Sequence, residues 1–288
     1  MSADPAVVAA ARANRAIDAL HAMLYFAPEA EEELTKIGLR PGRMCYFASR
    51  SAAMGPVPAG VTTATFYNFN PTLVARYIPR AWGLASIKDI LAARLTAADR
   101  ALRRLLGGDE AAGSPAVAEA AELARDATVG LSPHGRPLYA GHADLDWPEE
   151  AHLVLWHAVT LLREYRGDGH VAVLLAAQVT GLDALITHTA TGRGFTVAAA
   201  KNSRGWSDAE WAAAEARLRE HGLLDGAGLT VEGAQLRESI EAATDDIASD
   251  PWRRLGADRT DRLVELGRAL SRQVLNAGAF PADTFARR

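Results

Sequence analysis

Apolar side chains recur every three to four residues along most of this chain, which is the spacing of amphipathic helices. Alanine supplies much of the apolar content, and alanine-rich stretches poor in β-branched residues also favour helix. We therefore expect a mainly α fold. The predicted helices cover residues 6–37, 59–78, 84–106, 109–130, 149–166 and 170–190.

Capping and helix-breaking residues divide this pattern. Asn70 can cap a helix that starts at Pro71, and Gly107 can end the helix before it in a left-handed conformation. Gly167 is expected to end the helix that starts near residue 149, so that Arg166-Gly167-Asp168-Gly169-His170 would form a turn. Ser207, followed by Glu210, has the pattern of a capping box.

The longest stretch rich in proline and glycine, residues 131–148, is interpreted as a linker between a helical N-terminal half (1–130) and a C-terminal half (149–288). The two halves echo each other in sequence, which suggests a degenerate duplication. The echoed features are His21-Ala22 and His157-Ala158, Trp82 and Trp206, and an Ala-Arg-Leu triplet that follows each tryptophan.

The most specific local pattern lies between Trp206 and Gly233. Gly222 can end a helix with positive φ, and Thr230 can cap the next helix. The pattern resembles the last part of MarR-type winged-helix domains, in which a recognition helix, a β-wing and a further helix follow one another. The resemblance implies a winged-helix-like C-terminal half. The matching positions are Leu218, Gly222, Leu223, Leu229, Thr230 and Gly233.

Over nearly its whole length the chain also resembles an actinobacterial family of uncharacterised helix-turn-helix-like proteins. The matching stretches are residues 46–71, residues 156–174 and the segment from Trp206 onward. This resemblance implies a fold rather than an activity.

The charge pattern argues against a DNA-binding surface. The formal net charge is −4, whereas proteins that bind nucleic acid usually have a basic excess or a basic stripe. Residues 207–221 carry acidic side chains among their few basic ones, and the expected wing, residues 225–229, has no basic residue to contact phosphate. Nucleic acid is therefore an unlikely partner, and a MarR-type DNA-binding regulator is kept as an alternative function.

Three groups of side chains are candidates for a ligand site. The aromatic and amide residues of segment 46–70 are typical of a small-molecule pocket, with an ordinary aromatic core as the alternative. The charged cluster 163–170 could bind an anion, with a solvated turn as the alternative. The histidines could line a pocket or be hydrogen-bonded core residues. The candidate ligand-binding residues are His21, Tyr25, Arg50, Tyr67, Asn68, Asn70, His157, Arg163, Arg166 and His170.

These residues lead to three functional hypotheses. The first is a small-molecule-binding protein on a repurposed winged-helix scaffold, which could also be catalytic. The second is the MarR-type regulator, and the third is an enzyme that uses histidine acid–base chemistry on a small metabolite. If the halves pack about a pseudo-twofold axis, one internal cavity of roughly 300–1,000 Å³ should be lined by at least two of the residues His21, Tyr67, Asn68, His157 and His170.

The remaining composition narrows the setting. Cys45 is the only cysteine, so an intramolecular disulfide is impossible. The sequence contains no HExxH pattern, which would have suggested a metal site. No cofactor is expected. The N-terminus lacks the apolar core of a signal peptide, and no apolar run approaches the ~20 residues of a membrane span. We expect a cytoplasmic protein without a membrane segment, for which a homodimer is one possibility.

Overall fold

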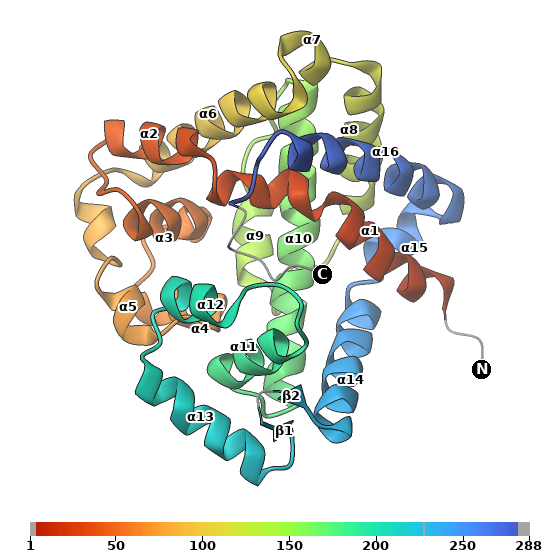
Figure 1. Ribbon diagram of the computed structural model, residues 1–288. Helices are drawn as coiled ribbons and strands as arrows, with labels where there is room; N and C mark the ends of the chain where they lie inside the picture. Colours follow the sequence, from red (N-terminus) through yellow and green to blue (C-terminus); the bar gives the residue numbers. More distant parts are fainter. Residues whose placement is uncertain (1–3, 227, 282–288) are drawn as a thin grey trace.

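The structure is a computed structural model that describes residues 4–226 and 228–281. It is built almost entirely of helices, as Figure 1 shows, and the prediction of a mainly α fold is confirmed. The first part of the chain contains α1 (Pro5–Ala22), α2 (Pro28–Lys36), α3 (Arg43–Ser51), α4 (Ala59–Phe66), α5 (Pro71–Ala75), α6 (Ile87–Leu106), α7 (Asp109–Ala112), α8 (Pro115–Thr128) and α9 (Pro137–Ala143).

The second part contains a long central helix, three shorter helices, a short antiparallel β-hairpin and three further helices. These elements are α10 (Ala151–Ala176), α11 (Gly181–Ala190), α12 (Val197–Arg204), α13 (Asp208–Glu220), β1 (Leu224–Asp225), β2 (Gly228–Leu229), α14 (Val231–Ile247), α15 (Asp250–Leu255) and α16 (Ala257–Asn276). Single turns of 3-10 helix lie at η1 (Met23–Tyr25), η2 (Ala52–Met54) and η3 (Arg80–Gly83).

The local capping predictions are confirmed. Asn70 Oδ1 accepts a hydrogen bond from the backbone of α5, and Gly107 ends α6 with φ 93°. Ser207 and Glu210 form both hydrogen bonds of a capping box at the start of α13. Gly222 follows α13 with φ 69°, and Thr230 caps α14 through its hydroxyl. Each of these caps joins residues that are close in sequence, which is why sequence alone predicts them.

The prediction that Gly167 ends a helix is wrong, because α10 continues to Ala176. Tertiary contacts outweigh the roughly 1 kcal/mol that a glycine costs within a helix. The buried carboxylate of Asp168 accepts hydrogen bonds from two backbone N–H groups at the start of α9, at 3.0 and 2.9 Å. Gly169 leaves the space that Arg136 occupies, since a Cβ there would lie 2.6 Å from Arg136 Nη1.

The two parts of the chain follow the same order of elements. A long helix (α1 or α10) precedes shorter helices, four in the first part and three in the second, and a long, a short and a long helix follow (α6 to α8, or α14 to α16). Gly42 and Gly192 both have positive φ and lie 150 positions apart in the sequence. The same is true of Gly55 and Gly205. This shared order is what an internal duplication predicts, and helices α1–α9 and α10–α16 are called the first and the second repeat below.

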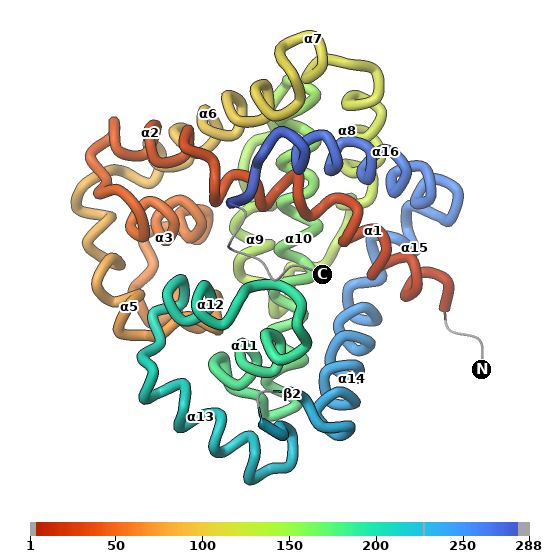
Figure 2. The backbone as a smooth tube through the Cα atoms, in the orientation of Figure 1, coloured from red at the N-terminus to blue at the C-terminus, as the bar shows by residue number. Residues whose placement is uncertain are grey.

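The repeats exchange their last helices. Helix α16 of the second repeat packs along α1 of the first, and α8 of the first packs along α10 of the second. Figure 2 shows α1 (red) beside α16 (blue), with α10 (green) running through the middle of the molecule. One hydrophobic cluster therefore contains side chains from α1, α6, α8, α10, α15 and α16. The two parts of the chain share one core.

The sequence echoes, however, do not mark equivalent positions. His21 is the second-to-last residue of α1, whereas His157 lies in the second turn of α10. The two Ala-Arg-Leu triplets lie in α6 and α13, which are not equivalent helices. The register inferred from these echoes is therefore wrong.

The stretch interpreted as a linker, residues 131–148, contains a helix of its own. Helix α9 lies within it and packs against α10 and η2. Among the described helices none is, by itself, both long and apolar enough to cross a membrane; α10 and α11 meet those criteria only as a pair bent by 102°.

Gly222 provides a test of the helix-turn-helix geometry. No atom would lie within 4 Å of a Cβ at this position, so a substitution is penalised only by its positive φ. We expect Gly222→Val to lower the free energy of unfolding by about 1–3 kcal/mol in urea denaturation.

Gly60 in α4 serves as the control, because it has equally open surroundings and no positive φ. Gly60→Ala should leave stability unchanged or raise it by up to ~1 kcal/mol. Equal effects of the two substitutions would show that the backbone at Gly222 is not left-handed.

Candidate ligand-binding site

A buried carboxylate lies where the two repeats meet. Glu164, on α10, is 1% exposed. Its oxygens accept hydrogen bonds from Arg50 Nη2 of α3 at 3.2 Å and from Arg163 Nη1 at 2.9 Å. Burial alone would raise the pKa of Glu164, but Arg163 and Arg50 outweigh it and hold the pKa well below its usual range. Glu164 is therefore ionised and joins α3 to α10.

His21 lies behind this ion pair, fully buried. Thr160 Oγ1 donates its proton to Trp156 O, so it accepts from His21 Nδ1 at 2.9 Å. His21 Nε2 is then an acceptor, and the hydroxyl of Tyr25 donates to it at 2.8 Å. Burial and the charge of Arg163 hold the pKa of His21 well below its ordinary value. A neutral His21 therefore fixes the direction of the Tyr25 hydroxyl.

Tyr46 lies between the arginines and an aromatic cluster. Arg50 Nη1 donates to its hydroxyl at 3.2 Å, and its ring contacts Tyr25 with 5.2 Å between centroids. Burial raises the pKa of Tyr46, but the nearby charges of Arg50, Arg204 and Arg163 leave it below the ordinary value. Three guanidinium groups thus converge on one phenol. The rest of the cluster is Phe47, Phe66, Phe69 and Tyr77.

Arg204, at the end of α12, faces the same cluster from the second repeat. Its guanidinium carbon lies 4.5 Å from the ring centre of Phe69 and 4.8 Å from that of Phe195. It donates to two neutral oxygens, Asn68 Oδ1 and Ser203 Oγ, both at 3.1 Å. No carboxylate in the described part of the chain forms an ion pair with Arg204, and burial lowers its pKa.

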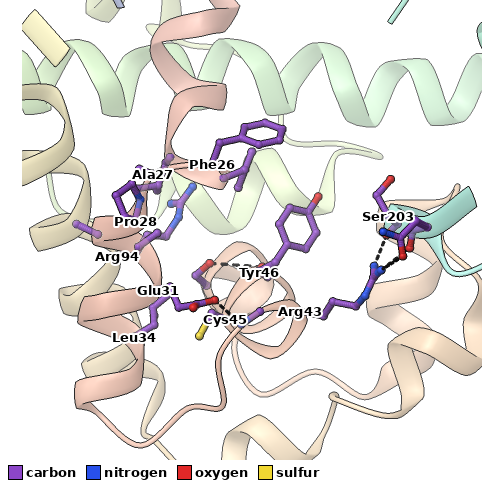
Figure 3. Close-up of a pocket in the computed structure, with 17 residues that line it drawn as sticks. Phe26, Ala27, Pro28, Glu31, Leu34, Arg43, Cys45, Tyr46, Arg94 and Ser203 are labelled. Carbon is purple, nitrogen blue, oxygen red and sulfur yellow. Dashed lines mark hydrogen bonds between the residues drawn. The ribbon is translucent and has the colours of Figure 1, made fainter. Parts of the chain in front are cut away.

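Four adjoining clefts meet at Tyr46, and we call them the Tyr46 clefts. Their volumes are about 540, 490, 720 and 310 Å³. Arg204 lines the last three of them, and Tyr25 lines all except the second. Figure 3 shows Tyr46 projecting into the 540 Å³ cleft, with Phe26 on one side and Ser203 on the other. The walls come from both repeats.

The structure brings most of the predicted site residues to these clefts. Of the predicted residues, those that line the 490 Å³ cleft are Arg50, Tyr67, Asn68, Arg163, Arg166 and His170. His21 lies behind Tyr25 without lining any of the Tyr46 clefts, and Asn70 caps α5. His157 makes an edge-to-face contact with the ring of Trp147, away from the clefts. Tyr67, Asn68 and His170 share this one cleft, which is open to the surface, whereas the prediction was of an internal cavity; their role in binding stays a prediction.

Two of these residues have partners that limit a binding role. Arg166 forms ion pairs with Glu241 at 3.1 Å and Asp245 at 3.0 Å, both on α14. His170 Nδ1 bonds to Thr244 Oγ1 at 2.9 Å, and burial lowers its pKa to about 4. They attach α10 to α14, so Arg166 has less free charge for a ligand than Arg204.

Sequence reasoning did not single out Glu164 or Arg204 as site residues. Glu164 had a usable signal, because it lies in the charged cluster 163–170 directly after the mostly apolar residues 153–162 of α10. Arg204 had none, since its aromatic partners lie in another repeat or in the loop before α12.

The helix-turn-helix of α12 and α13 has little free positive charge. Arg217 pairs with Asp183 at 3.4 Å, Arg219 with Glu215 at 3.2 Å, and Lys201 with a carboxylate at the start of α13 at 2.8 Å. The other exposed residues of α13 include Ala212, Ala213 and Ala216.

The start of α13 and the turn before it are also hydrogen-bonded to the first repeat. Asn70 Nδ2 donates to Glu210 Oε1 at 3.1 Å, and the Asn70 backbone N–H donates to Arg204 O at 2.9 Å. Trp206 Nε1 donates to Asn68 O at 2.9 Å. Segment 66–70 is thus hydrogen-bonded to the turn between α12 and α13.

Comparison with known families agrees with this arrangement. A family model described as a helix-turn-helix family matches residues 10–281. The chain belongs to this helix-turn-helix family. No curated protein matches the chain, and no solved structure does. The match covers nearly the whole chain, while the relation to MarR-type proteins stays an interpretation.

Within this helix-turn-helix protein, the described residues contain no group of three or more His, Cys, Asp or Glu side chains that could hold a metal ion. The chemistry available at the Tyr46 clefts is that of guanidinium, phenol and aromatic groups.

Removing the charge of Glu164 tests its role. Glu164→Gln leaves Arg50 and Arg163 without their buried carboxylate, and we expect it to destabilise the protein by about 3–5 kcal/mol in chemical denaturation. Glu241 is a matched control, because it also pairs with two arginines but is 44% exposed. Glu241→Gln should cost less than ~1 kcal/mol. Similar losses for both variants would contradict a central role for Glu164.

Proposed function

We propose that this protein binds a small anionic molecule in the Tyr46 clefts, on a helix-turn-helix scaffold that no longer serves DNA recognition. The observation that carries the proposal is Arg204, a guanidinium held between two aromatic rings without a carboxylate partner in the described structure. Burying an uncompensated charge is costly, and an anionic ligand would remove that cost.

The balance of charge around Tyr46 supports an anion. Arg50, Arg163 and Arg204 all act on its hydroxyl. Their only ion-pair partners among the described side chains are Glu164 and the 58% exposed Asp18, which lies 3.8 Å from Arg163. The clefts therefore have an excess of positive charge, and guanidinium groups bind carboxylate or phosphate through two parallel hydrogen bonds.

The size and lining of the clefts indicate the rest of the ligand. Volumes from about 310 to 720 Å³ suit a metabolite rather than a polymer. Phe69, Phe195 and Tyr46 offer apolar and aromatic surface next to Arg204. The ligand is therefore an acid with an apolar or aromatic body.

Catalysis by histidine has less support. A general acid or base must reach the substrate. His21 uses both ring nitrogens inside the protein, and His157 lies away from the clefts. Of the three named histidines, His170 alone lines a cleft, and its Nδ1 is bonded to Thr244.

DNA recognition is favoured by the family but opposed by the surface. The N-terminal part of a recognition helix enters the major groove in helix-turn-helix proteins. Here that part of α13 is hydrogen-bonded to Asn70, and its basic residues are paired with carboxylates.

A pair of related ligands tests the anion proposal. Phenylacetate and its neutral amide, phenylacetamide, have nearly the same size and shape, but the amide is uncharged and has an NH₂ donor in place of one carboxylate oxygen. We expect phenylacetate to raise the melting temperature of the wild-type protein and the amide to have little effect. Arg204→Gln should weaken binding at least tenfold, the loss expected for a charge-assisted hydrogen bond worth more than about 1.4 kcal/mol.

Arg253 provides the matched control, since it is half-exposed and paired with Asp4 and Asp250 outside the clefts. Arg253→Gln should leave the phenylacetate response unchanged. Equal stabilisation by acid and amide, or an unchanged response in Arg204→Gln, would refute the proposal.

DNA binding can be tested directly. We expect no duplex binding tighter than ~1 µM at physiological salt, because α13 and its hairpin lack free basic groups. A gel shift at lower concentrations that disappears on Arg217→Glu and Arg219→Glu substitution would show that α13 reads DNA.

A further inference from the structure

A second group of polar side chains is buried beside the Tyr46 clefts without enough partners. Arg94, on α6, is 3% exposed and stacks over the ring of Trp156 at 4.7 Å. It interacts with the hydroxyl of Tyr25, but its Nε and Nη2 have no hydrogen-bond partner. No carboxylate in the described chain forms an ion pair with it.

His142 on α9 is fully buried, and neither of its ring nitrogens has a partner. The buried Nε2 of His157 and Nε1 of Trp156, both on α10, also lack partners. Arg94 contacts Trp156, which directly precedes His157 on α10, and its charge lowers the pKa of both His142 and His157. Helices α6, α9 and α10 bring them together, since α10 packs against both of the others.

The unpartnered groups contain a surplus of donors. Arg94 has three free N–H groups, one on Nε and two on Nη2, and Trp156 has one; neither side chain can accept. A neutral His142 adds one donor and one acceptor. A water molecule would bring two further donors into this space, whereas an anion only accepts hydrogen bonds.

The local charge leads to the same conclusion. Burial lowers the pKa of His142 well below its ordinary value and that of His157 to about 4, so both histidines are neutral. Glu164, the nearest ionised carboxylate acting on Arg94, is already bonded to Arg50 and Arg163. The charge of Arg94 therefore has no dedicated counterion.

We propose that Arg94 and His142 hold a monovalent inorganic anion of halide size in the interior, between α6, α9 and α10. Only a small ion suits this place, because Arg94, His142 and His157 are at most 4% exposed and neither histidine lines a Tyr46 cleft. Arg94 also borders the 540 Å³ cleft beside Pro28, as Figure 3 shows, and this cleft gives an ion a route to the interior. The anion neutralises Arg94 and fixes the positions of Tyr25 and Trp156.

Bromide is the probe for this site, because it replaces chloride and scatters anomalously. In crystals of the wild-type protein grown with sodium bromide, we expect an anomalous peak between Arg94 and His142. In solution at constant ionic strength, bromide or chloride should raise the melting temperature in a saturable way relative to gluconate, which is too large to enter. Specific binding to the folded state has this mass-action signature.

Two arginine variants separate this site from the ligand site. The halide-dependent shift should be lost in Arg94→Met and retained in Arg204→Gln, whereas the response to phenylacetate depends on Arg204. If Arg94→Met does not fold, His142→Phe takes its place in the melting-temperature experiment. The anomalous map of the wild-type crystals tests the site without any variant.

Three results would overturn the proposal. They are an anomalous map without a peak at Arg94, a halide shift that persists in Arg94→Met or His142→Phe, and a peak without any halide shift in solution, which would mean an adventitious ion only. None of them bears on the anion proposed for Arg204.

Discussion

The ion pair network of Glu164 is the interaction on which the rest of the structure depends. An ionised carboxylate with 1% exposure is tolerated only because guanidinium groups from α3 and α10 surround it. It fixes Arg50 against the aromatic cluster and Arg163 against the first repeat, and His21 and Tyr25 complete the buried polar layer. The Tyr46 clefts are the space left between this layer and the end of α12.

The exchange of helices explains why the clefts lie where they do. Because α16 packs on α1 and α8 on α10, the two repeats are interlocked and neither can form its core alone. The helix-turn-helix unit keeps a small core of its own around Trp211, Leu185 and Leu218. The first repeat docks on that unit through segment 66–70, so a change at Arg204 and Asn68 would reach the turn before α13 directly.

Sequence reasoning predicted what depends on neighbours along the chain. The caps at Asn70, Ser207 and Thr230 and the turn at Gly222 each need only a few adjacent residues. Gly167 was misread because its helix is held by contacts with α9, which lies about thirty residues earlier in the chain.

The site was predictable only in part, for the same reason. The aromatic segment around Tyr67 and Asn68 and the arginines at 163 and 166 were recognisable by composition. The unpaired state of Arg204 was not, because it depends on which distant residues fill its surroundings.

The central claim is that Arg204 holds the acidic group of a small molecule between the repeats. The most direct measurement is a crystal structure with a brominated derivative of whichever carboxylate stabilises the protein most. The account predicts anomalous bromine density inside the Tyr46 clefts, with the carboxylate against Arg204 and the ring near Phe69 and Phe195. Bromine density outside these clefts, or a carboxylate that points away from Arg204, would contradict it.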